Sequence, residues 1–99
     1  MSVRQPADHF FAAQAYLNSN EPHKAITAFD AVLSANASLP FKPHQEDAEY
    51  YLALAYLKAG DAAKALPLLE SIHDQPAHSY HKEVGSWYIT QVRWLTRKQ

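Results

Sequence analysis

Apolar side chains recur along this chain with the spacing of helices that are buried on one face. In five segments they fall at positions i, i+3, i+4 and i+7, which places them on one face of an α-helix. The first segment has an unusually wide apolar face, so we expect it to make contacts on two sides. The predicted helices span residues 8–18, 22–33, 46–59, 62–72 and 80–98.

Short connections join the first four helices into two hairpins. Pro22 stands in a first turn, where its missing N–H costs nothing, and Gly60-Asp61 supplies a helix-ending glycine followed by a capping aspartate. Links this short make the helices of each hairpin antiparallel. Residues 34–45 contain two prolines and several small polar residues, which predicts a longer loop between the hairpins.

Two local features of the predicted helices have a structural interpretation. Pro67 lies several residues inside the fourth helix, where we expect one lost backbone hydrogen bond and a slight bend near Ala63. Glu46, Asp47 and Glu49 open the third helix, where carboxylates are favoured by the positive end of the helix dipole. We interpret them as helix-start residues rather than catalytic acids.

The two hairpins carry the same residue template. It reads His9-x2-Ala12-Ala13-x2-Tyr16 with Ala25-x3-Phe29 in the first copy, and Glu49-x2-Leu52-Ala53-x2-Tyr56 with Ala65-x3-Leu69 in the second. Small residues at equivalent positions of the two copies mark close helix crossings. The template therefore predicts two equivalent hairpins lying side by side.

This template resembles the tetratricopeptide repeat, a 34-residue helix pair of pattern W-x2-L-G-x2-Y, then A-x3-F, then P. The second copy matches better, through Leu52, Ala53, Tyr56, Gly60, Asp61, Ala65, Leu69, Ile72 and Pro76. In the first copy Asn20 replaces the turn glycine and His9 stands where Trp is usual. Ala25 and Ala65 are 40 positions apart rather than 34, so the link between the copies is longer.

The resemblance implies an all-α fold of antiparallel helix-turn-helix repeats with five helices. We expect one domain over residues 1–99, with repeat one at about 6–36, a linker at 37–45, repeat two at about 46–76 and a capping helix at about 79–98. A final helix without a partner is expected to cover the end of the second pair.

The resemblance also implies docking of a protein partner on a concave face lined by the first helix of each pair. Carried over by position, that face consists of Phe10, Gln14, Leu17, Asn18, Tyr50, Leu54, Leu57 and Lys58. It is apolar rather than basic, which favours a helix or an extended peptide with bulky side chains over a C-terminal carboxylate. We therefore expect a non-catalytic protein-interaction or assembly scaffold.

The alternative function is self-association, as a helical module of a larger bacterial envelope or regulatory protein. On the fifth helix we expect Trp87 to be buried against the fourth helix and Trp94 to be at least partly exposed. An exposed Trp94 beside Leu95 is a surface for homodimerisation, because large apolar patches on small domains mark interfaces.

Composition narrows the classes of function. The chain has 99 residues, of which 47% are hydrophobic and 19% charged, with a net charge of -1, so it lacks the basic stripe of a nucleic-acid-binding domain. It has no cysteine, which excludes disulfides and thiolate sites. No apolar run approaches about 18 residues, so we expect no membrane insertion by this segment and a soluble protein of the cytoplasm or periplasm.

Signatures of catalysis are missing from the sequence. We find no Gly-rich phosphate loop, no G-x-S-x-G elbow and no H-E-x-x-H, and therefore expect no enzyme activity and no cofactor. His78-x2-His81 places two imidazoles within one turn, but only Asp74 or Glu83 would complete a metal site. Because the remaining histidines are scattered, we favour no metal site.

Overall fold

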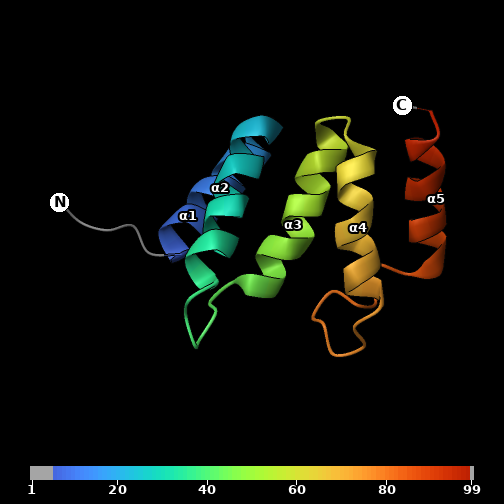
Figure 1. The fold of residues 1–99 in the computed structure, drawn as a ribbon. Coiled ribbons are helices and arrows are strands. Elements are labelled where there is room, and N and C mark those ends of the chain that lie inside the picture. Colours follow the sequence, from blue (N-terminus) through green and yellow to red (C-terminus); the bar gives the residue numbers. More distant parts are fainter. Residues whose placement is uncertain (1–5, 99) are drawn as a thin grey trace.

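The computed structural model describes residues 6–98, which form five helices. They are α1 (Pro6–Asn18), α2 (Pro22–Asn36), α3 (Gln45–Lys58), α4 (Ala62–His73) and α5 (Ser86–Thr96). Within the described residues there is no strand, and the expectation of an all-α fold with five helices is confirmed. The helices stack in chain order from α1 and α2 to α5, each packed on its neighbours (Figure 1).

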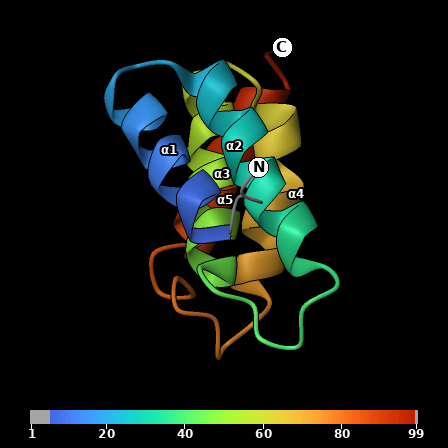
Figure 2. The same ribbon diagram turned by 90° about the vertical axis from the view of Figure 1, so that its left-hand side faces the viewer.

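The two long loops lie at the same end of the stack. Residues 37–44 connect α2 to α3, and residues 74–85 connect α4 to α5. Both loops extend from the lower end of the helices in Figure 1 and again after the turn of view in Figure 2, where α1 and α2 lie in front of the other helices. The tight turns of both hairpins lie at the opposite end.

The tight turns of the two hairpins make the same hydrogen bonds 40 positions apart. Backbone N–H groups donate to backbone carbonyls from Asn20 to Leu17 (3.2 Å), from Glu21 to Tyr16 (2.8 Å), from Gly60 to Leu57 (3.1 Å) and from Asp61 to Tyr56 (2.8 Å). This pair of bonds closes the last turn of a helix and needs a left-handed residue. Asn20, at φ 59°, supplies that conformation in place of the glycine, which has φ 82° at Gly60.

A lysine early in α2 and in α4 repeats a second set of contacts. Each lysine lies over the tyrosine ring near the end of the preceding helix and pairs with the acidic residue just before its own helix. The distances are 5.7 Å from Lys24 Nζ to the Tyr16 ring centroid, 3.1 Å from Lys24 to Glu21, 6.0 Å from Lys64 Nζ to the Tyr56 ring centroid and 3.9 Å from Lys64 to Asp61. The template is therefore a structural repeat as well as a sequence repeat.

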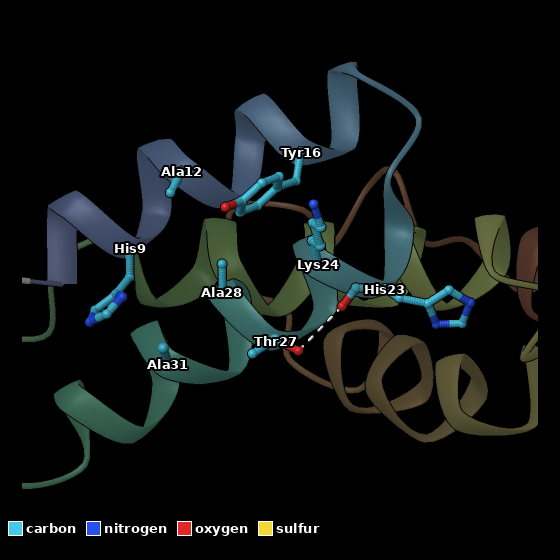
Figure 3. A pocket seen from close by; sticks show the side chains of 8 residues that line it. All are labelled: His9, Ala12, Tyr16, His23, Lys24, Thr27, Ala28 and Ala31. Carbon is cyan, nitrogen blue, oxygen red and sulfur yellow. Dashed lines mark hydrogen bonds between the residues drawn. The ribbon is translucent and has the colours of Figure 1, made fainter.

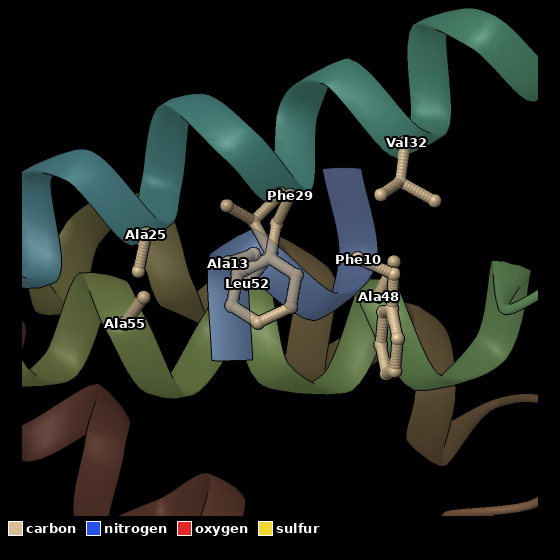
Figure 4. Close-up of a cluster of buried hydrophobic side chains, with 8 residues drawn as sticks. All are labelled: Phe10, Ala13, Ala25, Phe29, Val32, Ala48, Leu52 and Ala55. Atoms are coloured by element: carbon tan, nitrogen blue, oxygen red, sulfur yellow. The ribbon is translucent and has the colours of Figure 1, made fainter. Parts of the chain in front are cut away.

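The apolar faces form two core clusters. The first joins α1, α2 and α3 and consists of Phe10, Ala13, Ala25, Phe29, Val32, Ala48, Leu52 and Ala55 (Figure 4). The second joins α3, α4, the following loop and α5, and consists of Ala53, Ala62, Ala65, Leu69, Ile72, Val84, Ile89 and Val92. In Figure 4 Ala25 of α2 faces Ala55 of α3, so small residues set a close helix crossing between the two hairpins.

The last helix differs from its prediction in its start and in its buried side. It begins at Ser86 rather than Tyr80, and residues 74–85 form a series of turns. The prediction that Trp87 is buried against the fourth helix is wrong, because its side chain is 73% exposed and Ile89 and Val92 face the core instead. Trp94 is 54% exposed, as predicted.

Pro67 does not interrupt α4, which runs from Ala62 to His73 with the proline on its exposed side. The bend near Ala63 stays a prediction. No helix among residues 6–98 combines the length and the apolar character that crossing a bilayer requires.

Candidate functional site

The predicted partner face is only partly open. Gln14, Leu17, Tyr50, Leu54 and Leu57 are half-buried, and Asn18 and Lys58 are exposed. Phe10 is 7% exposed and belongs to the first core cluster. Phe10 therefore supports this face from below rather than lining it.

His44 is the residue that covers Phe10. Its ring stacks on the Phe10 ring, with centroids 4.3 Å apart and an interplanar angle of 9°. His44 has φ 60°, a left-handed conformation that a non-glycine residue adopts at a cost, and it immediately precedes α3. No local pattern in the sequence indicates this contact, because His44 reaches α1 only through the course of the long loop.

The loop that carries His44 is fixed at its start by Asn36, which is fully buried at the end of α2. Asn36 Nδ2 donates to the Pro43 carbonyl (2.9 Å) and to Gln45 Oε1 (3.1 Å). Lys42 Nζ donates back to the Asn36 carbonyl (2.8 Å), where a cation satisfies an open helix end. These bonds hold α3 in place relative to α2.

Three carboxylates at the start of α3 hold the second long loop. Glu46 Oε1 accepts from the Ser79 hydroxyl (2.6 Å) and the Ser79 N–H (3.1 Å), Asp47 Oδ1 accepts from the Tyr80 hydroxyl (2.6 Å), and Glu49 Oε1 accepts from His78 Nε2 (2.9 Å). The Tyr80 N–H donates to His78 Nδ1 (3.1 Å), which assigns the ring proton to Nε2. We name these six side chains the carboxylate clasp.

The clasp changes the pKa values of two of its members. The two hydrogen bonds from Ser79 lower the pKa of Glu46 below its usual value, because they stabilise the ionised carboxylate. Burial raises the pKa of Tyr80 well above its usual value, and the bond from its hydroxyl to Asp47 raises it further. Tyr80 also stacks on Tyr50, with ring centroids 4.2 Å apart, so it partly covers this predicted partner residue.

The two histidines that suggested a metal site, His78 and His81, contact different parts of the protein. His78 takes part in the clasp, whereas the His81 ring lies 6.0 Å from the ring of His73 on α4. Among residues 6–98 no three His, Asp or Glu side chains are placed together to hold a metal ion. The surface of the described residues has several hollows, and two of them bear on the binding of a partner.

The first hollow lies between α1 and α2, on the side away from α3, and has a volume of about 620 Å³. Figure 3 shows Tyr16 of α1 and Lys24 of α2 approaching one another at one end of this groove. The groove is lined by His9, Ala12, Tyr16, His23, Lys24, Thr27, Ala28 and Ala31. Its floor consists of small residues. Phe11 of α1 is exposed outside this lining, and its ring centroid lies 5.7 Å from that of His44.

The second hollow is on the outer face of α5 and has a volume of about 520 Å³. It is lined by Trp87, Thr90, Gln91, Trp94 and Leu95. The two residues predicted for self-association, Trp94 and Leu95, therefore lie in it together with Trp87. Lys98 Nζ lies 4.0 Å from the centroid of the Trp94 ring and covers part of that ring.

Comparison with known proteins shows that the chain matches the model of one protein family. The model of the YfiO family, described as outer membrane lipoprotein, matches residues 3–99. This family contains tetratricopeptide repeats, so the match supports the resemblance found in the sequence. Searches of curated proteins and of solved structures gave no match.

Proposed function

The chain belongs to the YfiO family of outer membrane lipoproteins, and from this membership and its fold we propose that it is a non-catalytic scaffold that binds other proteins. The observation that carries the proposal is the exact repetition of turn bonds and lysine contacts in two hairpins of a repeat family. Repeat hairpins of this kind present extended surfaces to partner chains. The family description also supports a site of action at the outer membrane.

Within this proposal, residues 6–36 and 46–76 act as two repeats, 37–45 as their linker and 79–98 as the cap. The partner, a helix or an extended peptide, docks on the face formed by the first helix of each repeat. Its half-buried apolar members are Leu17, Tyr50, Leu54 and Leu57, and its polar members are Gln14, Asn18 and Lys58. With a single cation on this face, affinity comes from buried apolar area, at about 25 cal/mol per Å².

Site-specific photo-crosslinking tests the face. A photoreactive phenylalanine analogue is placed at Leu54, at Gln14 and, as a control, at the exposed loop residue Lys82. The crosslinking is done in cells that have an outer membrane. We expect the same partner to be crosslinked from the first two positions and not from the third. Equal crosslinking from all three positions, or from none, would contradict the proposed face.

A second candidate function is self-association through the outer face of α5. The observation in its favour is the exposure of Trp87, Trp94 and Leu95 on one helix face. Sedimentation velocity over a wide concentration range distinguishes the two functions. A mass that rises with concentration, and that stays monomeric in a Trp94→Ser, Leu95→Ser variant, supports self-association; a constant monomer mass excludes it.

A further inference from the structure

One surface of the second repeat is covered by α2 of the first repeat. Phe29 of α2 stacks on Tyr51 of α3, with ring centroids 6.2 Å apart and an interplanar angle of 15°. Ala25 of α2 faces Ala55 of α3 (Figure 4), and Leu68 of α4 packs on the same cluster. The α3–α4 hairpin therefore presents a surface that binds a helix, and the helix bound there is α2.

The first repeat presents the equivalent surface without a helix on it. The residues 40 positions before Tyr51, Leu52, Ala55, Tyr56, Lys64 and Leu68 are Phe11, Ala12, Ala15, Tyr16, Lys24 and Ala28. Four of these line the 620 Å³ groove between α1 and α2. Ala55 is fully buried under α2, whereas Ala15 is exposed and Phe11 is 63% exposed. An aromatic residue and a small crossing residue are thus left open on α1 where their counterparts on α3 are covered.

From this equivalence we propose that the α1–α2 groove binds an amphipathic α-helix of a partner protein, built on the pattern of α2. The inference rests on the proposed scaffold function and assigns it a second surface, distinct from the face formed by α1 and α3. The expected helix has a small residue where α2 has Ala25, a large aromatic residue where it has Phe29, and a carboxylate at the next position.

The carboxylate follows from two opposite charges that line one cavity between the repeats. Asp30 of α2 and Lys64 of α4 line one cavity at the seam between the repeats, together with Tyr56. Burial raises the pKa of Asp30, and the charge of Lys64 opposes that rise, so the lysine favours the ionised aspartate. Lys24 is the counterpart of Lys64 and has the same contacts to its tyrosine and its acidic neighbour. A helix in the α1–α2 groove would therefore meet a lysine in the same place.

The size of the aromatic residue follows from the floor of the groove. Leu52 and Leu68 in the second repeat are replaced by Ala12 and Ala28 in the first. Each replacement removes a branched side chain from the floor and leaves space, which a larger group on the partner can fill. A tryptophan therefore suits the central position of the partner helix better than the phenylalanine of α2.

A second copy of this chain is a poor source for that helix. The α2 pattern is already engaged, because Ala25 and Phe29 are fully buried against the copy's own core. The helix that does expose aromatic residues, α5, carries or adjoins the cations Arg93, Arg97 and Lys98. These have the same sign as Lys24, so the pairing lacks the charge complementarity found between α2 and α4.

The probe is a synthetic peptide with the sequence of residues 22–36, carrying Phe29→Trp together with Thr27→Lys and Ala31→Glu, whose side-chain amine and carboxyl are joined in a lactam with loss of water. The lactam is needed because a free helix of this length is marginally stable in water, and its two positions lie on the side of α2 that faces away from α3. Titration into the full, isotope-labelled chain is followed by NMR. We expect saturable shifts at Phe11, Ala15 and Lys24. Shifts confined to α3 or α5, or no saturable shift while the peptide stays soluble, would overturn the proposal.

Variants separate this groove from other surfaces. Ala15→Glu places a charge at the close crossing and should weaken peptide binding at least about tenfold, while the exposed Ala63→Glu on α4 should leave it unchanged. A peptide with Asp30→Lys should bind about threefold more weakly, and Lys24→Glu in the chain should restore its binding. Equal effects of Ala15→Glu and Ala63→Glu, or no rescue by charge reversal, would count against the assigned orientation.

Failure of this inference and failure of the scaffold function give different results. Leu54→Glu alters the α1–α3 face and should leave peptide binding intact, whereas Ala15→Glu should weaken peptide binding at least about tenfold and leave crosslinking from Leu54 intact. If the peptide does not bind while the crosslinks at Leu54 form, the scaffold function stands and the groove assignment falls. If the peptide binds while no crosslink forms, the groove stands and the α1–α3 face falls.

Discussion

Asn20 and Gly60 have the same left-handed backbone conformation in two turns that make identical hydrogen bonds. The left-handed position of the turn is thus occupied by asparagine in the first repeat and by glycine in the second. Asparagine visits this region more readily than other residues with a Cβ, which is why the first turn forms although the glycine of the family pattern is absent.

Gly60→Ala should destabilise the protein by about 1–2 kcal/mol, the cost of a left-handed residue with a Cβ. No atom lies within 4 Å of a Cβ built at Gly60, so the loss would come from the backbone and not from a clash. Asn20→Gly should change the stability by less than about 0.5 kcal/mol. Chemical denaturation measures both, with Gly85→Ala as a control at φ -82°. A tolerated Gly60→Ala would mean that the turn can form by another conformation.

Ala53→Leu and Ala65→Leu should each cost about 1–3 kcal/mol, because both alanines are fully buried at crossings between α3 and α4 and a larger side chain forces the helices apart. Ala63→Leu, at an exposed position of α4, is the matched control. Thermal unfolding followed by circular dichroism measures the difference. Full stability of either core variant would show that the two helices do not cross closely at that alanine.

Stability should fall as the pH rises above about 10, where tyrosines ionise in the unfolded chain. The pKa of Tyr80 is raised in the folded protein, so the folded state keeps a proton that the unfolded state loses, and the contribution is complete only below the unfolded pKa. Burial raises the pKa values of Tyr50, Tyr56 and Tyr88 in the same direction. Denaturation at a series of pH values gives the slope.

Tyr80→Phe is the variant that tests the clasp in this alkaline range. It removes the hydroxyl that bonds Asp47 and should lower the stability at neutral pH by about 1 kcal/mol. Its stability should also depend less on pH above about 10 than that of the unmodified chain. An unchanged pH dependence would place the responsible ionisation elsewhere among the tyrosines.

The protein should become less stable in acid as Glu46 takes up a proton. Its pKa is lowered by Ser79 in the folded state, so its contribution is present above the unfolded pKa of a glutamate and is lost as the pH falls through the lower folded value. Glu46→Gln should flatten this part of the stability profile, and Ser79→Ala should shift the carboxyl titration of Glu46 upward. NMR titration of the side-chain carboxyl measures the shift directly.

The sequence predicted the hairpins well because their determinants are local. Within each hairpin, the helical spacing and the turn residues, such as Gly60-Asp61, lie within a few helical turns of one another and place their residues without reference to the rest of the chain. The repetition 40 positions later shows that both hairpins use the same local determinants. The loop from 74 to 85 was predicted poorly for the opposite reason. His78 and Glu49 are 29 residues apart in sequence, and no local pattern indicates that they bond.

The candidate site was predicted in part, and its errors have similar causes. Both sides of α5 carry large apolar residues, Trp87 and Trp94 on one and Ile89 and Val92 on the other, so periodicity alone does not say which side meets α4. Phe10 falls where the family has an open face, but His44 covers it from a loop of irregular course. The α1–α2 groove became recognisable only when the structure showed α2 lying on the equivalent surface of the second repeat.

The carboxylate clasp also has a consequence for the order in which the chain folds. Glu46, Asp47 and Glu49 leave the ribosome well before the serine, tyrosine and histidine that bond them, and local helix and turn contacts form faster than contacts between distant residues. The two hairpins can therefore assemble while the carboxylates are still hydrated. Docking of residues 78–80 then orients the entry into α5, which makes α5 the last of the five described helices to pack.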